Sequence, residues 1–166
     1  INNAGVAATA TGVEVCPGPL GGVEWNGPAL DRPNKALVVG AVDWCSINIA
    51  DEGFQFKPGV FNLGGKFKFS DLSRGWITSL DADIGGIRWK YETQGPQVSG
   101  ITPTSGGVIF AGDMKGNFYV LASADGRELY KTQTGGAMAG GVITYMRKGK
   151  QYVAGTSGNV SRVTWG

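Results

Sequence analysis

The residues able to do chemistry in this chain are few, and their types narrow the possible reactions. The 166 residues include no histidine and only two cysteines, Cys16 and Cys45. A Ser-His-Asp triad, a Cys-His pair and any histidine-based metal site are therefore excluded within the chain. Two thiolates are also too few for a four-cysteine zinc site. A reaction would have to use carboxylates, a cofactor or residues from another segment.

Four aspartates that stand near glycines are candidates for calcium ligands or a catalytic base: Asp81, Asp83, Asp113 and Asp125. Aspartate is favoured in such positions because its carboxylate bonds the backbone of a tight turn. We therefore interpret all four as turn residues, and we assign no catalytic or metal-binding residue in this chain.

The composition indicates an all-β domain. Glycine accounts for 29 of 166 residues, far above the norm of roughly 7%, which disfavours a helix bundle. Five Trp, seven Phe and five Tyr supply enough apolar surface to exclude disorder. The chain has no apolar run long enough for a transmembrane segment. The 15 basic and 13 acidic residues give no reason to expect a nucleic acid or lipid partner.

An internal repeat indicates how the elements that position these residues are arranged. Residues 75–81 align with residues 116–122, and residues 85–90 align with residues 126–131; both offsets are 41 residues. Such a period is typical of a four-stranded propeller blade of roughly 40–50 residues. The sequence therefore predicts a partial β-propeller of about three to four blades of roughly 41 residues.

Short β-prone runs separated by Gly- and Asp-containing turns support this prediction. The clearest runs are residues 36–40, 108–112, 117–121 and 151–154. Residues 50–70 do not follow the repeat and are expected to form an irregular inserted loop. This Phe-, Gly- and Lys-rich loop is interpreted either as an apolar strap over the side of the propeller or as a segment for substrate access or subunit contact.

We expect the chain to be part of a larger propeller, because a truncated propeller leaves unpaired strand edges. It opens at Ile1 with neither an initiator methionine nor a signal segment. The missing blades are expected to come from a longer polypeptide or from a second copy of the chain.

Several motifs resemble the pyrroloquinoline quinone (PQQ)-dependent, or quinoprotein, alcohol dehydrogenases, which are eight-bladed propellers with tryptophan-docking repeats. Residues 80–89 (LDADIGGIRW) resemble the docking repeat, with Tyr130 in place of the tryptophan in the next copy. Residues 15–29 (VCPGPLGGVEWNGPA) and 43–45 (DWC) resemble the stretch that lies against PQQ in that family. Residues 75–89, 101–113 and 140–155 resemble its C-terminal blades.

The resemblance implies site residues. Glu24 and Trp25 stand where the family has Asn-Trp against PQQ, so both are candidate cofactor-binding residues. Glutamate departs from the family pattern, because a carboxylate repels an anionic cofactor unless it is protonated or paired. The alternative for Trp25 is a blade-packing role. Residues 155–158 are expected either on the cofactor face or as an ordinary turn.

The resemblance also implies a structural disulfide between Cys16 and Cys45, worth about 3 kcal/mol or somewhat more on the chain-entropy estimate. A disulfide requires an oxidising compartment, in a bacterium the periplasm. The alternative is two unrelated buried thiols.

The implied function is that of the C-terminal portion of a periplasmic PQQ-dependent dehydrogenase that oxidises alcohols or sugars and passes electrons to a cytochrome c. Calcium would polarise the quinone, but the family's calcium ligands and catalytic aspartate lie N-terminal to the matched region. The segment alone is therefore expected to be inactive. The alternative is a non-catalytic propeller scaffold, as in outer-membrane assembly lipoproteins. The stretch CPGPLGGVEWNGP favours the enzyme, whereas the missing aspartate segment favours the scaffold.

Overall fold

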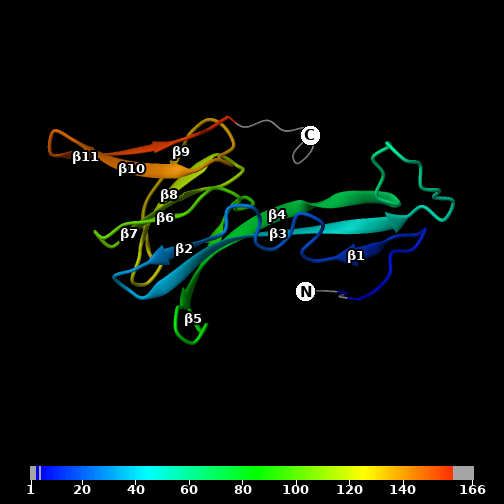
Figure 1. The fold of residues 1–166 in the computed structure, drawn as a ribbon, viewed down its shortest axis with the longest axis horizontal. Coiled ribbons are helices and arrows are strands. Elements are labelled where there is room, and N and C mark those ends of the chain that lie inside the picture. The colour runs from blue at the N-terminus through cyan, green and yellow to red at the C-terminus, as the bar shows by residue number, and fades with distance from the viewer. Residues whose placement is uncertain (1–2, 4, 159–166) are drawn as a thin grey trace.

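The chain folds into antiparallel sheets in a computed structural model that describes residue 3 and residues 5–158 (Figure 1). This part of the chain contains no helix, which confirms the all-β prediction. The strands are β1 (Val13–Val15), β2 (Pro28–Asp31), β3 (Ala36–Ala50), β4 (Gly65–Asp81), β5 (Ile87–Thr93), β6 (Thr102–Pro103), β7 (Val108–Gly112), β8 (Asn117–Ala122), β9 (Glu128–Gln133), β10 (Val142–Arg147) and β11 (Lys150–Gly155).

Each sheet has the strand order of a propeller blade. The first blade pairs β2, β3, β4 and β5 in sequence, and the second blade pairs β6, β7, β8 and β9. The strands β10 and β11 form a hairpin that we call the third-blade hairpin. The described residues thus hold two four-stranded blades and a hairpin of a third, as expected of a partial propeller. Residues 45–72 extend two strands of the first blade and do not build another.

The inserted segment is a hairpin arm, which we call the ribbon. The strands β3 and β4 run 15 and 17 residues and stay paired out to Ala50 and Gly65. Only residues 51–64 at its tip are irregular, so the loop is shorter than the expected 50–70. In Figure 1 the ribbon projects away from the blades. The side chains of Phe56 and Phe61 are 76% and 89% exposed. The described residues therefore do not pack as an apolar strap over the side of the propeller.

The second blade shows why these runs form strands. Along β8 the residues Asn117, Tyr119 and Leu121 are buried and alternate with partly exposed ones, as expected for a strand with one covered face. The turn that joins β7 to β8 is fixed by Asp113, whose carboxylate accepts hydrogen bonds from the backbone N–H groups of Lys115 (2.9 Å) and Asn117 (3.0 Å).

The hydrophobic core lies between successive sheets. One buried cluster joins the first and second blades through Val38, Ile77, Ile101, Ile109, Ala111, Tyr119 and Leu121. A second cluster of Phe110, Met138 and Val142 joins the second blade to the third-blade hairpin. Since the sheets pack face to face, the loops that connect one sheet to the next gather at one edge of the stack, where the candidate site lies.

None of the described residues forms a helix that is long and apolar enough to cross a membrane.

Candidate functional site

A groove with a volume of about 510 Å³ lies where the loop before β2 meets the end of the third-blade hairpin. We call it the Trp25 groove. It is lined by Trp25, Ala139, Gly140, Thr156, Ser157 and Gly158. The structure thus brings the predicted Trp25 and the predicted turn of residues 155–158 to one place, although most of the chain separates them in sequence.

The loop that carries Trp25 is held at both ends against β3. Gly22 exchanges two backbone hydrogen bonds with Val42 (3.0 and 2.9 Å), and Pro28 opens β2 opposite Val39. Between these anchors, Gly27 adopts φ +56°, a left-handed conformation that glycine tolerates well. The Trp25 side chain is 67% exposed. The Trp25 side chain is therefore accessible in this chain and lines the groove, and its alternative role in packing against a further blade stays a prediction.

The opposite wall depends on close backbone packing. A Cβ on Gly140 would lie 1.9 Å from Thr156 Oγ1, so only glycine fits there without displacing the threonine. The Ser157 hydroxyl donates to Thr134 Oγ1 (2.8 Å) and to the carbonyl of Gly136 (2.9 Å), which ties the turn to the second blade. This side of the groove, which we call the glycine wall, therefore has small residues at Ala139, Gly140 and Gly158, with the Thr156 hydroxyl packed against Gly140.

Glu24 is not part of the groove lining, although it precedes Trp25. Its side chain is half-buried, so the structure brings only one of the two predicted cofactor-binding residues to the groove.

The aspartates behave largely as the sequence predicts. Asp81 accepts from the backbone N–H of Asp83 (2.9 Å), and Asp125 accepts from that of Arg127 (3.0 Å). Asp113 bonds its own turn. Nowhere in residues 5–158 do three or more acidic or cysteine side chains gather closely enough to hold a metal ion.

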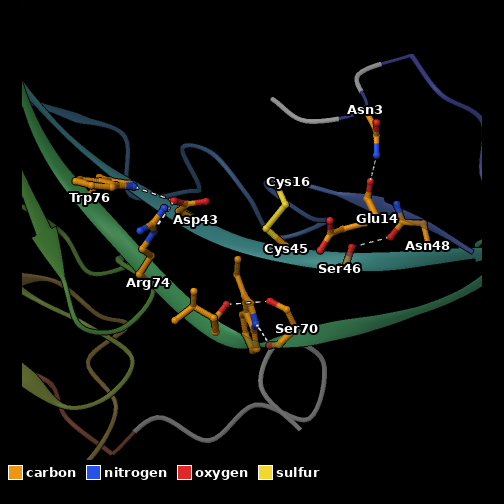
Figure 2. The surroundings of a disulfide bond; sticks show 12 residues. Asn3, Glu14, Cys16, Asp43, Cys45, Ser46, Asn48, Ser70, Arg74 and Trp76 are labelled. Carbon is orange, nitrogen blue, oxygen red and sulfur yellow. Dashed lines mark hydrogen bonds and ion pairs between the residues drawn. A yellow bond between two sulfur atoms is a disulfide. The ribbon is translucent and has the colours of Figure 1, made fainter.

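The predicted disulfide between Cys16 and Cys45 is confirmed (Figure 2). Cys16 follows β1 directly, and Cys45 lies at the register shift of β3 between Trp44 and Ser46. The bond therefore fastens the segment leading to the Trp25 loop onto β3, at the point where the first blade passes into the ribbon.

A charged cluster stands beside the disulfide on the same stretch of β3 and on β4 (Figure 2). Asp43 accepts hydrogen bonds from Arg74 Nε (2.8 Å) and Trp76 Nε1 (3.0 Å). Burial by itself raises the pKa of the Asp43 carboxyl, but the bonds from Trp76 and Arg74 outweigh it, so the pKa lies below its usual value. The cluster links β3 to β4, the two strands that support the Trp25 loop.

The lining determines which ligands the groove can take. An exposed indole face stacks on planar ring systems, and a hydroxyl together with loop backbone groups can bond the oxygens of such a ring. The described residues of the lining have no titratable side chain, so these residues can bind and orient a ligand but cannot transfer its protons. The arrangement fits one wall of a site for a flat, polar aromatic group.

Known proteins match the chain over long stretches of its sequence. The sequence model of the family described as outer membrane protein assembly factor BamB matches residues 73–165. The quinoprotein ethanol dehydrogenase of Pseudomonas putida is 30% identical over 158 residues, which are 93% of this chain and 25% of that protein. The lanthanide-dependent methanol dehydrogenase of Methylorubrum extorquens is 30% identical over 87% of this chain and 25% of its own length.

Solved structures agree with the sequence relatives. A europium-containing methanol dehydrogenase superposes with a TM-score of 0.74 at 26% identity, covering 87% of this chain and 27% of that one. The quinohemoprotein alcohol dehydrogenase of Comamonas testosteroni gives a TM-score of 0.71 at 22% identity, a likeness of fold. The chain therefore spans about a quarter of the length of the curated relatives that it matches.

Proposed function

Because this chain belongs to the propeller family described as outer membrane protein assembly factor BamB and is homologous to quinoprotein alcohol dehydrogenases, we propose that it is a portion of a PQQ-dependent alcohol dehydrogenase. Its task in that enzyme is to supply one wall of the PQQ site. The observation that carries the proposal is the Trp25 groove, where an exposed indole faces a glycine-lined wall with a hydroxyl.

The chain's own residues have a binding role in this function. Trp25 holds the flat ring system by stacking, and the Thr156 hydroxyl bonds an oxygen at its edge. PQQ, when bound, supplies the electron acceptor for alcohol oxidation. Glu24 stays a predicted cofactor-binding residue that would need protonation or a basic partner. Calcium belongs to the same proposal, with its ligands and the catalytic base in blades outside this chain.

The remaining blades, from a longer polypeptide or a second copy, are proposed as partners. The support is that the third-blade hairpin exposes Ile143, Tyr145 and Met146 at 60%, 48% and 69%, and Tyr130 on β9 is 56% exposed. Apolar faces of this kind are covered by the next sheet in a closed propeller. Cytochrome c as electron acceptor stays a prediction. A periplasmic location is proposed on the disulfide, which persists in oxidising compartments.

A scaffold without catalysis is the second candidate, and the description of the matched family favours it. That match begins at residue 73, however, so it omits the disulfide and the Trp25 loop. The match to the quinoprotein ethanol dehydrogenase covers 93% of the chain, a share too large to leave out the residues of either feature. A binding scaffold has no need of an exposed indole opposite a glycine wall, and for this reason we favour the dehydrogenase.

The test is a calorimetric titration of the chain with PQQ in the presence of Ca²⁺. Saturable binding that weakens about tenfold or more in Trp25→Ala is expected, since base-like aromatic stacking is worth about 1–3 kcal/mol. The matched control is Phe61→Ala, which removes an exposed aromatic side chain from the ribbon and should leave the affinity unchanged. Equal affinities in wild type and Trp25→Ala would contradict the proposed role of Trp25. Failure of the wild type to bind would contradict the proposal that this wall binds PQQ by itself.

A further inference from the structure

A buried pair of amide side chains lies directly behind the Trp25 loop. Asn26 Nδ2 donates to Gln97 Oε1 (3.1 Å) and to the carbonyl of Ser99 (3.0 Å). The space for this pair exists because β3 has a glycine there: a Cβ on Gly40 would lie 1.8 Å from Gln97 Oε1 and 2.9 Å from Asn26 Nδ2. The residue that follows Trp25 is thus bonded to the segment that connects the first blade to the second.

Gln97 is itself fixed from the other side. It is fully buried, and its Nε2 donates to Ser99 Oγ (3.1 Å) and to the carbonyl of Gly112 (3.3 Å). Ser99 Oγ in turn accepts from the N–H of Gly112 (2.7 Å). A side chain bonded at both ends of its amide has one orientation, so it can transmit the position of the second blade to Asn26.

The repeat shows that blade packing does not require this amide. Gln97 and Met138 stand 41 residues apart, at the same place in successive connections. Met138 fills the space over Gly112, where a Cβ would lie 2.6 Å from its Sδ, as Gln97 fills the space over Gly40. Both side chains are buried. The thioether of Met138 therefore fills one junction without an amide. At the other junction, the role of the Gln97 amide is its hydrogen bond to Asn26.

The same contacts lead to the opposite wall of the groove. Gly112 is bonded to Gln97 and Ser99 on one side and packed against Met138 on the other. Met138 is followed directly by Ala139 and Gly140, which line the groove. A continuous set of buried contacts thus joins the loop of Trp25 to the wall that faces it, through the interior of the second blade.

We infer that Asn26 and Gln97 are positioning residues that hold the Trp25 loop at a fixed separation from the glycine wall of the groove. The identity of the ligand rests on the proposed function, whereas the positioning itself rests on the contacts described above. A binding wall made from two blades needs such a link, because a stacked ring loses its contacts when its platform shifts by a fraction of an ångström.

Gln97→Met tests this inference with little risk to the fold. Methionine has a similar shape and already occupies the equivalent position. The carbonyl of Gly112 keeps its bond from Ser99 Oγ (2.9 Å), and the carbonyl of Ser99 keeps its bond from Asn26. The matched control is Gln151→Met, the same substitution at an exposed position of β11, where the amide donates to Thr144 Oγ1 (2.8 Å) and takes no part in these contacts. We expect Gln97→Met to weaken PQQ binding about tenfold, with Gln151→Met unchanged and with similar melting temperatures for both variants.

A second measurement separates this inference from the proposed function. In a chain labelled with 5-fluorotryptophan, the ¹⁹F resonance of Trp25 is identified by its loss in Trp25→Phe. We expect this resonance to shift or broaden in Gln97→Met and to stay in place in Gln151→Met. An unchanged resonance together with an unchanged PQQ affinity would overturn the positioning role. A changed resonance in a chain that binds no PQQ would uphold the positioning role and contradict the proposed function.

Discussion

The indole of Trp89 lies against the backbone of Gly126, so closely that a Cβ on the glycine would be 2.5 Å from Trp89 Cε3. Trp89 Nε1 also donates a hydrogen bond to the carbonyl of Ser123 (3.1 Å). This places the tryptophan of the first blade on the last turn of the second blade, as the repeat pattern predicts. The equivalent Tyr130 is 56% exposed.

Substitution of Gly126 should reveal the strength of this contact. Gly126→Ala adds a methyl group at φ +73°, against the ring, and is expected to lower the free energy of unfolding by about 1–3 kcal/mol. Gly85→Ala is the matched control, because Gly85 has φ +72° at the equivalent turn with no atom near its Cβ position. Urea unfolding of both variants measures the difference. Equal losses would show that backbone strain alone, and not docking, sets the cost.

The disulfide should contribute to stability mainly through the Trp25 loop and β1. A double Cys16→Ser, Cys45→Ser variant opens a loop of 29 residues, for which chain entropy gives a loss of about 3.6 kcal/mol. We expect faster amide hydrogen exchange in β1, with little change in β8 at the centre of the second blade. Uniform acceleration in both strands would contradict a local role.

Lowering the pH should reduce the stability that Asp43 contributes to the folded chain. Its pKa is lowered in the folded chain, so the stabilisation it provides is present above the unfolded pKa of about 3.9 and is lost as pH falls through the lower folded pKa. Asp43→Asn should therefore be less stable than wild type at pH 6, and the difference should shrink towards pH 3. Trp76→Phe, which removes one of the two bonds, should show a smaller effect of the same sign. Melting curves at each pH measure both.

High pH should lower the stability of the folded chain because of Tyr119. This phenol is buried, and its hydroxyl donates to Asp113 Oδ2 (2.7 Å); burial and this bond raise its pKa above the usual value. The stabilisation is present below the unfolded pKa of about 10 and is lost as pH rises beyond it, because the unfolded chain ionises first. Tyr119→Phe should lower stability at neutral pH by about 1–2 kcal/mol and lose less stability in alkali. Tyr145→Phe, at a half-exposed position, is the comparison.

Much of the fold follows from local pattern and period. The runs at residues 108–112 and 117–121 are strands in the structure because alternation and flanking turns determine such elements locally. The docking of Trp89 on the next blade was implied by the resemblance of residues 80–89 to a docking repeat. The ribbon was not predictable in the same way, since pairing of residues 46–50 with 65–69 breaks the period and depends on a hairpin with a long tip.

The candidate site, too, was only partly predictable from the sequence. The sequence by itself determined the exclusion of histidine chemistry, because the residue types suffice for it, whereas the disulfide partners and the candidate Trp25 were implied by a family resemblance. Only the tertiary structure decided that residues 156–158 face Trp25, that Glu24 stays outside the groove and that Asn26 is bonded to Gln97. These residues are far apart in the chain, and their contacts arise only when consecutive sheets stack and bring their connecting loops to one edge.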